Sequence, residues 1–177
     1  MVSALTAAEL AARAARIALV VTDNDGVLTD ATVYVGPSGE AMKLYSVRDG
    51  MGVERLRNAD IATAVLTREP PTLIAPRAHK LELRYLWTSV RDKRAHLTQI
   101  LAETGLGVDQ LAYIGDDVND LGIIAAFGGA GLTAAPGDAM PEVRGAVHYV
   151  CEATGGRGAF REVAEWLLRL RTPGGPS

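Results

Sequence analysis

Short aliphatic runs alternate along this chain with alanine-rich amphipathic stretches. The aliphatic runs predict strands at residues 17–22, 61–66, 83–87, 111–114 and 129–132, with a further short one at 147–150. The amphipathic spacing predicts helices from Thr6 to about Arg16 and over residues 53–58, 91–103, 118–126 and 159–169. Strands that alternate with helices are typical of a parallel sheet covered on both faces, so the pattern predicts an α/β fold.

One segment interrupts this alternation directly after the first predicted strand. Residues 31–47 contain two β-prone runs around the turn sequence Gly36-Pro37-Ser38-Gly39, which predicts an inserted β-hairpin. No connection is long enough to hold a compact additional domain. We therefore expect a single domain over residues 1–171. The final residues 172–177 carry no apolar anchor and are expected to form a flexible tail.

The first predicted strand runs into two carboxylates, Asp23 and Asp25, followed by Gly26. Residues two apart in an extended segment point to the same side, so both acids would face one crevice. Two carboxylates together with substrate phosphate oxygens suit Mg²⁺, although an Asx-rich turn leaving the strand is an alternative. An EF-hand loop is excluded, because aligning Gly26 with its sixth position places Val21 and Thr32 where acids are required.

A second acidic cluster, Asp116, Asp117 and Asp120, follows the predicted strand at 111–114. Aspartates at this place can simply cap the following helix. The carboxyl ends of neighbouring strands in an open α/β sheet, however, face one crevice. We therefore expect the two clusters to meet there around a cation.

Two further residues fit the same crevice. Thr67 ends a predicted strand, and its hydroxyl could bind an anion. Lys93 lies in the first turn of a predicted helix that Asp92 can cap, where the helix dipole disfavours a positive charge unless an anionic ligand is bound. The ordinary alternatives are a structural threonine and a solvated lysine.

Composition narrows the class of protein. The 177 residues are 48% apolar, which is enough for one core, and a net charge of -3 with scattered basic residues provides no face for nucleic acid. The lone Cys151 excludes an internal disulfide framework and Cys-type zinc sites and fits a reducing compartment. Residues 1–21 resemble neither a signal peptide nor a membrane span. We therefore expect a cytoplasmic protein without a membrane partner.

The order of these motifs, DxDG, Thr, Lys and GDDxND, resembles the haloacid dehalogenase superfamily of aspartate-nucleophile phosphatases. The resemblance is greatest to its capless branch, which includes 3-deoxy-D-manno-octulosonate 8-phosphate phosphatase, through DNDGVLTD, YSVRDGMGV, RDK, YIGDDVNDL and GGRGAFREV. It implies a Rossmann-like doubly wound parallel sheet with no cap domain. A response-regulator receiver domain is excluded, because its Asp, Thr and Lys come in a different order.

The resemblance also implies a reaction. Asp23 would attack phosphorus to form an aspartyl phosphate, while Asp25 would protonate the leaving oxygen and then activate water. Thr67 and Lys93 would bind the oxygens of the transferring phosphoryl group.

A metal site follows from the same resemblance. Mg²⁺ would be held by the Asp23 carboxylate, the Asp25 main-chain carbonyl and the Asp116 carboxylate. Asp117 and Asp120 would brace waters or the lysine.

The substrate implied by the resemblance is a small phosphorylated sugar acid. The 8-phosphate of 3-deoxy-D-manno-octulosonate is the leading substrate and a nonulosonate 9-phosphate is the second. Arg48 and Arg157 could pair with the sugar carboxylate, or each is an ordinary loop arginine. The family pattern also implies a homotetramer formed through the hairpin at residues 32–47, in which a neighbour closes the entrance to the site.

The chain departs from the family pattern at two places. Thr67 is followed by Arg68 and Glu69 instead of Gly-Arg, and Asn24 replaces an aliphatic residue. A different class of function is a non-catalytic module that partners a sugar nucleotidyltransferase. Such a module would not need the acids and the lysine, which are all present: Asp23, Asp25, Lys93 and Asp116.

Overall fold

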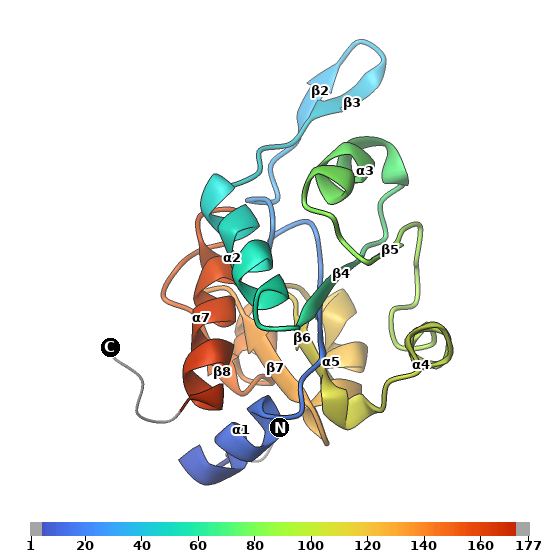
Figure 1. Cartoon of the computed structure of the whole chain (residues 1–177). Helices are drawn as coiled ribbons and strands as arrows, with labels where there is room; N and C mark the ends of the chain where they lie inside the picture. The colour runs from blue at the N-terminus through green and yellow to red at the C-terminus, as the bar shows by residue number, and fades with distance from the viewer. Residues whose placement is uncertain (1–4, 173–177) are drawn as a thin grey trace.

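Six parallel strands form the central sheet of the computed structural model, which describes residues 5–172 (Figure 1). Their order across the sheet is β5-β4-β1-β6-β7-β8. The strands are β1 (Leu19–Thr22), β4 (Ala62–Leu66), β5 (Tyr85–Trp87), β6 (Leu111–Ile114), β7 (Leu132–Ala135) and β8 (Tyr149–Val150). The chain builds outward from β1 first to one side and then to the other, so the predicted doubly wound α/β fold is confirmed. The reversal of strand order places a crevice at the carboxyl end of β1, between β4 and β6.

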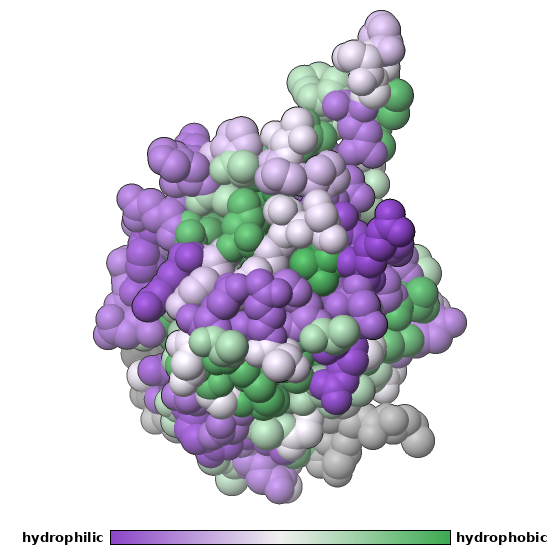
Figure 2. Space-filling model, turned by 90° about the vertical axis from the view of Figure 1, so that its right-hand side faces the viewer, coloured by the Kyte–Doolittle hydropathy of each residue, from purple (hydrophilic) through white to green (hydrophobic). Residues whose placement is uncertain are grey.

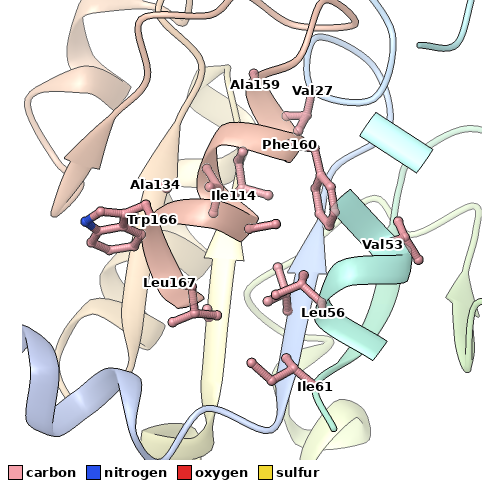
Figure 3. Packing of buried hydrophobic residues seen from close by; sticks show 14 of the residues in the cluster. Val27, Val53, Leu56, Ile61, Ile114, Ala134, Ala159, Phe160, Trp166 and Leu167 are labelled. Carbon is pink, nitrogen blue, oxygen red and sulfur yellow. The ribbon is translucent and has the colours of Figure 1, made fainter. Parts of the chain in front are cut away.

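Helices cover both faces of this sheet and create two cores. The helices are α1 (Ala7–Ala14), α2 (Val47–Arg57), α3 (Pro71–Lys80), α4 (Leu97–Thr104), α5 (Leu121–Gly128), α6 (Pro141–Arg144) and α7 (Ala159–Arg171). In the core shown in Figure 3, Phe160 of α7 packs with Val53 and Leu56 of α2 beside the sheet. No helix within residues 5–172 is long and apolar enough to cross a membrane.

The hairpin predicted after the first strand is present as β2 (Tyr34–Gly36) and β3 (Gly39–Met42). It stands away from the body of the molecule (Figures 1 and 2) and exposes apolar side chains, among them Val35, Met42 and Leu44. Within residues 5–172 nothing larger is inserted, so the absence of a cap domain is confirmed over that range. The predicted tail lies outside the described residues except for Thr172.

Helix α3 is absent from the sequence prediction. Residues 70–76 contain three prolines, and proline disfavours a helix in its interior. Pro71, however, occupies the first helical turn, where its missing N–H has no intrahelical partner to lose. Pro76 lies inside the helix, which buries Ile74 and Ala78. Burial of this face therefore outweighs the lost backbone hydrogen bond.

Several predicted boundaries were also wrong. Helix α2 begins at Val47 instead of residue 53, because the Ser46 side chain caps it by accepting bonds from the next backbone amides. Helix α4 begins at Leu97 instead of residue 91, because the Asp92 carboxylate closes a separate turn by accepting from the Ala95 amide. Strand β7 lies three residues later than predicted, because the glycines at 129 and 131 belong to the turn after α5.

Asp49 joins the start of α2 to the start of α7. Its carboxylate is buried and accepts hydrogen bonds from the amides of Gly158 at 3.2 Å and Arg161 at 3.0 Å. Burial raises the pKa of Asp49, and the amide donors oppose that rise. The motifs YSVRDGMGV and GGRGAFREV, distant in sequence, are thus one structural unit.

We expect Asp49→Ala to lower the free energy of unfolding by about 1–2 kcal/mol, because it leaves two partly buried amides without their acceptor. Chemical denaturation measures this change. Glu54→Ala, an exposed position on the same helix, serves as the control and is expected to shift stability by less than about 0.5 kcal/mol. Equal small effects of the two substitutions would contradict the role given to Asp49.

Candidate functional site

The backbone at the end of β1 brings the two acidic loops together. The Asp23 amide donates to the Ile114 carbonyl at 2.9 Å, which ties the loop after β1 to the end of β6. Gly26 has a φ of +79°, and a Cβ at this position would overlap the Asp116 carboxylate. Only glycine therefore allows both the turn and the close approach of the second loop.

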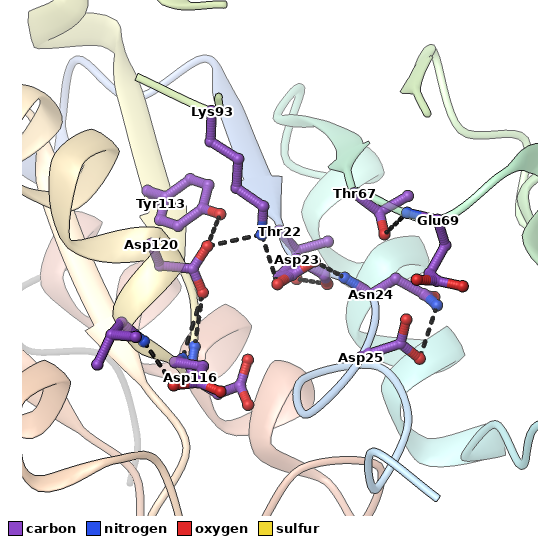
Figure 4. A network of polar contacts seen from close by, with 12 residues as sticks. Thr22, Asp23, Asn24, Asp25, Thr67, Glu69, Lys93, Tyr113, Asp116 and Asp120 are labelled. Carbon is purple, nitrogen blue, oxygen red and sulfur yellow. Dashed lines mark hydrogen bonds and ion pairs between the residues drawn. The ribbon is translucent and has the colours of Figure 1, made fainter. Parts of the chain in front are cut away.

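Three carboxylates converge in this crevice (Figure 4). Asp23, Asp116 and Asp120 each offer an oxygen, and the three oxygens lie within 4.8 Å of one another. They come from the two acidic motifs at the carboxyl ends of β1 and β6.

Lys93 reaches into the same cluster. Its ammonium donates to Asp23 Oδ2 at 2.5 Å and to Asp120 Oδ1 at 2.6 Å, and its side chain is fully buried. Burial opposes the charge of Lys93, but the two carboxylates outweigh burial and hold its pKa above the ordinary value. The structure thus excludes a solvated lysine. Lys93 lies in the turn that precedes α4, not in the first turn of the helix as predicted.

Asp120 is fully engaged in holding this arrangement. Besides Lys93, its Oδ1 accepts from the Tyr113 hydroxyl at 2.7 Å, and its Oδ2 accepts from the Asp116 amide at 3.0 Å. The Asp117 side chain is instead turned to the Val118 amide, from which it accepts at 2.6 Å. Asp120, and not Asp117, therefore contacts the lysine.

The cluster carries more negative than positive charge. Burial first, and then the neighbouring carboxylates, raise the pKa of Asp116 to about 8. Burial likewise raises the pKa of Asp23 to about 7, although Lys93 opposes this shift. Among the described residues no hydrogen-bond donor is directed at the Asp116 carboxylate. A divalent cation with a preference for oxygen ligands fits this donor set, because it would neutralise the excess charge.

Asp25 lies beside the cluster and has partners of its own. Its carboxylate accepts from Asn24 Nδ2 and from the Thr29 hydroxyl, both at 3.2 Å. It also pairs with Lys43, whose Nζ lies 2.8 Å from Oδ1. The Tyr45 hydroxyl in turn donates to Asn24 Oδ1 at 3.2 Å. Lys43 and Tyr45 follow β3 and were absent from the sequence prediction, which also assigned no consequence to Asn24.

Thr67 follows β4 and is buried on the same crevice (Figure 4). Its hydroxyl accepts from the Glu69 amide at 3.1 Å. The Glu69 carboxylate lies 3.7 Å from Lys43 Nζ, whereas the Arg68 side chain is exposed. A pocket of about 380 Å³ opens next to these residues, with a lining of Asn24, Glu40, Lys43, Glu69, Pro70, Thr72, Leu73 and Ile74. Glu69 and Pro70 in the unusual sequence after Thr67 therefore help to line a cavity that Asn24 and Lys43 also line.

The two predicted carboxylate-binding arginines lie apart from the acidic cluster. Arg48 is exposed in the first turn of α2. Arg157 has a 71% exposed side chain and lies 3.6 Å from Asp30. Within residues 5–172 neither guanidinium pairs with the clustered acids.

Comparison with known proteins shows which family this chain resembles. No family model matches the chain. The chain is 39% identical over 156 residues to the 3-deoxy-D-manno-octulosonate 8-phosphate phosphatase KdsC of Yersinia pestis. This alignment covers 88% of the chain and 82% of that protein. The phosphatase of the same name from Moraxella catarrhalis, solved with magnesium, phosphate and KDO, superposes with a TM-score of 0.85 at 30% identity and covers 92% of each chain.

A second solved structure gives the wider relationship. A Legionella pneumophila protein named as a hydrolase of HAD superfamily subfamily III A superposes with a TM-score of 0.86 at 34% identity, over 93% of this chain and 88% of that one. The chain therefore belongs to the 3-deoxy-D-manno-octulosonate 8-phosphate phosphatase family of the haloacid dehalogenase superfamily.

Proposed function

We propose that this protein is a Mg²⁺-dependent phosphatase that hydrolyses 3-deoxy-D-manno-octulosonate 8-phosphate through an aspartyl-phosphate intermediate. The observation that carries the proposal is the buried contact of Lys93 with Asp23. The three carboxylates of this cluster carry more negative charge than the single lysine neutralises. A phosphoryl group on Asp23 would lie within reach of a fixed ammonium group. The identity to named relatives supports the choice of substrate.

Asp23 and Asp25 divide the chemistry between them in this proposal. An oxygen of Asp23 bonds to phosphorus as the bond from phosphorus to the sugar oxygen breaks, and Asp25 gives its proton to that oxygen. Water then attacks phosphorus and gives a proton to Asp25, which releases inorganic phosphate and restores Asp23. The Asn24 amide, which donates to Asp23 Oδ1 at 2.7 Å, orients the nucleophile.

The remaining residues stabilise the negative charge of the phosphoryl group. Lys93 and Thr67 hold the phosphoryl oxygens, and Asp120 orients Lys93. Asp23, Asp116 and the Asp25 main-chain carbonyl would hold Mg²⁺, which when bound neutralises the phosphoryl oxygens.

Binding of Mg²⁺ is expected to depend on pH. Asp23 and Asp116 have pKa values of about 7 and about 8 in the folded protein, above the ordinary 3.8, so the metal-free folded state binds extra protons. Its stability should therefore fall as pH rises from about 4 through about 8. Mg²⁺ competes with these protons, so its stabilisation should grow over the same range.

Thermal unfolding with Mg²⁺ or with a chelator, at about pH 6 and about pH 8.5, measures both trends. The melting-temperature difference between Mg²⁺ and chelator should be greater at the higher pH, and Asp116→Asn should reduce it. A difference that is equal at both pH values, or unchanged in Asp116→Asn, would argue against this metal site.

Assembly and substrate entry form part of the proposal. The exposed apolar side chains of the hairpin support a homotetramer formed through residues 32–47. Arg48 and Arg157 keep exposed side chains with which they could meet the substrate carboxylate. The free, buried Cys151 is consistent with a place in the reducing cytoplasm.

Phosphate release from a panel of sugar phosphates tests the function. The panel contains the octulosonate 8-phosphate, a nonulosonate 9-phosphate and glucose 6-phosphate, each with Mg²⁺ or with chelator. The octulosonate ester is expected to exceed the others in kcat/KM by about 100-fold or more, and only with Mg²⁺. A higher kcat/KM for the nonulosonate 9-phosphate would make that ester the substrate in place of the octulosonate 8-phosphate. No phosphate release from any ester would favour the non-catalytic module.

A further inference from the structure

Lys43 is a buried charge in an otherwise exposed segment. It follows β3 at the base of the hairpin, and its side chain is only 7% exposed. Its sequence neighbours Met42 and Leu44 are 60% and 55% exposed. The chain thus buries an ammonium group and exposes the two apolar side chains beside it, which reverses the usual preference. The proposed assembly through residues 32–47 would cover Met42 and Leu44, so it is the burial of Lys43 that a polar partner must explain.

That partner is Asp25. Lys43 Nζ lies 2.8 Å from Asp25 Oδ1 and 2.9 Å from Oδ2, so the ammonium contacts both carboxylate oxygens. Its other acidic partners are farther away, with Glu69 at 3.7 Å and Glu40 at 3.9 Å. The principal contact therefore joins the hairpin to the loop that carries the acids.

The contact belongs to a network that fixes the orientation of one carboxylate. Asn24 and Thr29 donate to Asp25 Oδ1 from its own loop, and Tyr45 holds Asn24 in place from the hairpin. A proton donor misplaced by about 1 Å can lose two orders of magnitude in rate. A partly exposed ion pair of this kind contributes little net stability by itself, so its main effect is on the orientation of the carboxylate.

We propose that Lys43 is a positioning residue that holds the Asp25 carboxylate in the orientation needed for proton transfer. The base of the hairpin is then part of the catalytic machinery, in addition to any role in assembly. The inference rests on the proposed function, which assigns the proton transfers to Asp25.

Lys43→Met tests this role when its activity is compared on two esters whose leaving groups differ in their need for a proton. A sugar oxygen must be protonated as it leaves, whereas p-nitrophenolate leaves without a proton. The variant is expected to lose about 10- to 100-fold in kcat on the octulosonate 8-phosphate, with KM within about threefold. With p-nitrophenyl phosphate the first turnover should stay within about threefold of wild type. The later turnovers should be slow, because hydrolysis of the intermediate also needs Asp25.

Three further variants separate positioning from a merely structural role. Lys43→Arg should recover part of the lost kcat, because a guanidinium can also contact both carboxylate oxygens. Tyr45→Phe should show the same leaving-group pattern with a smaller loss of about two- to fivefold. Arg84→Met removes an exposed positive charge beside Tyr85, before β5, at the opposite end of the strands from the site, and should leave both substrates unaffected.

Two results would overturn the inference. Equal losses in the first turnover of both esters would mean that Lys43 acts on the phosphoryl group or on the fold. A rise in KM of tenfold or more at unchanged kcat would mean that it binds substrate. If wild type does not hydrolyse the octulosonate ester, the proposed substrate fails, and comparison of phenyl with p-nitrophenyl phosphate still tests Lys43.

Discussion

Asp23→Asn is expected to reduce the rate of phosphate release by at least about 10⁴-fold, with the fold intact. The substitution keeps the size of the side chain and an oxygen that can accept from the Asn24 amide, but it replaces a carboxylate with a poor nucleophile. Steady-state assays with Mg²⁺ and the preferred ester measure the loss. Asp109→Asn, at a half-exposed position paired with Arg16, is the matched control and should retain full activity.

Stability should move in the opposite direction from activity. Burial disfavours the ionised form of Asp23, so the amide is expected to leave the metal-free protein as stable as wild type or more so. Residual activity above about 1% of wild type would show that Asp23 is not the nucleophile. A loss of stability together with activity would show that the carboxylate is needed for folding.

Lys93→Met is expected to lose both catalysis and stability. It removes the cation that contacts Asp23 and Asp120 and leaves these buried carboxylates uncompensated, which should cost about 3–5 kcal/mol. The lost contact with the phosphoryl group should reduce kcat by about 10³-fold. Chemical denaturation and steady-state kinetics give the two losses separately.

The double variant Lys93→Met/Asp120→Asn provides the control for this prediction. Removing one of the two uncompensated charges should restore part of the stability and none of the activity. A single variant within about 1 kcal/mol of wild type would contradict the account, as would a double variant that regains activity.

Much of the fold could be predicted from the sequence, because its determinants are local. The aliphatic runs of β1 and β6 are buried as neighbouring parallel strands, which the alternation of aliphatic and amphipathic segments predicts. Helix α3 was missed because proline content opposes a helix locally, whereas burial of Ile74 favours it only in the assembled protein. The start of α2 depends on the Ser46 cap, and the start of α4 depends on a separate preceding turn that Asp92 closes; periodicity alone reveals neither.

The same distinction applies to the site. Asp23 and Asp116 directly follow strands, so their convergence could be predicted from parallel-sheet geometry. The contact between Lys43 and Asp25 could not be predicted, because it forms only when the segment after β3 returns to the loop after β1. The predicted carboxylate role of Arg48 and Arg157 depends on which surfaces meet in an assembly, which sequence spacing does not encode.

The measurement that tests the central claim most directly is capture of the phosphorylated enzyme. Wild-type protein would be mixed with the octulosonate 8-phosphate and Mg²⁺, quenched in acid within milliseconds, digested and mapped by mass spectrometry. We predict a phosphoryl group on Asp23 that appears and decays at rates consistent with kcat. Rapid release of inorganic phosphate with no phosphoryl group on Asp23 at any time would contradict the account.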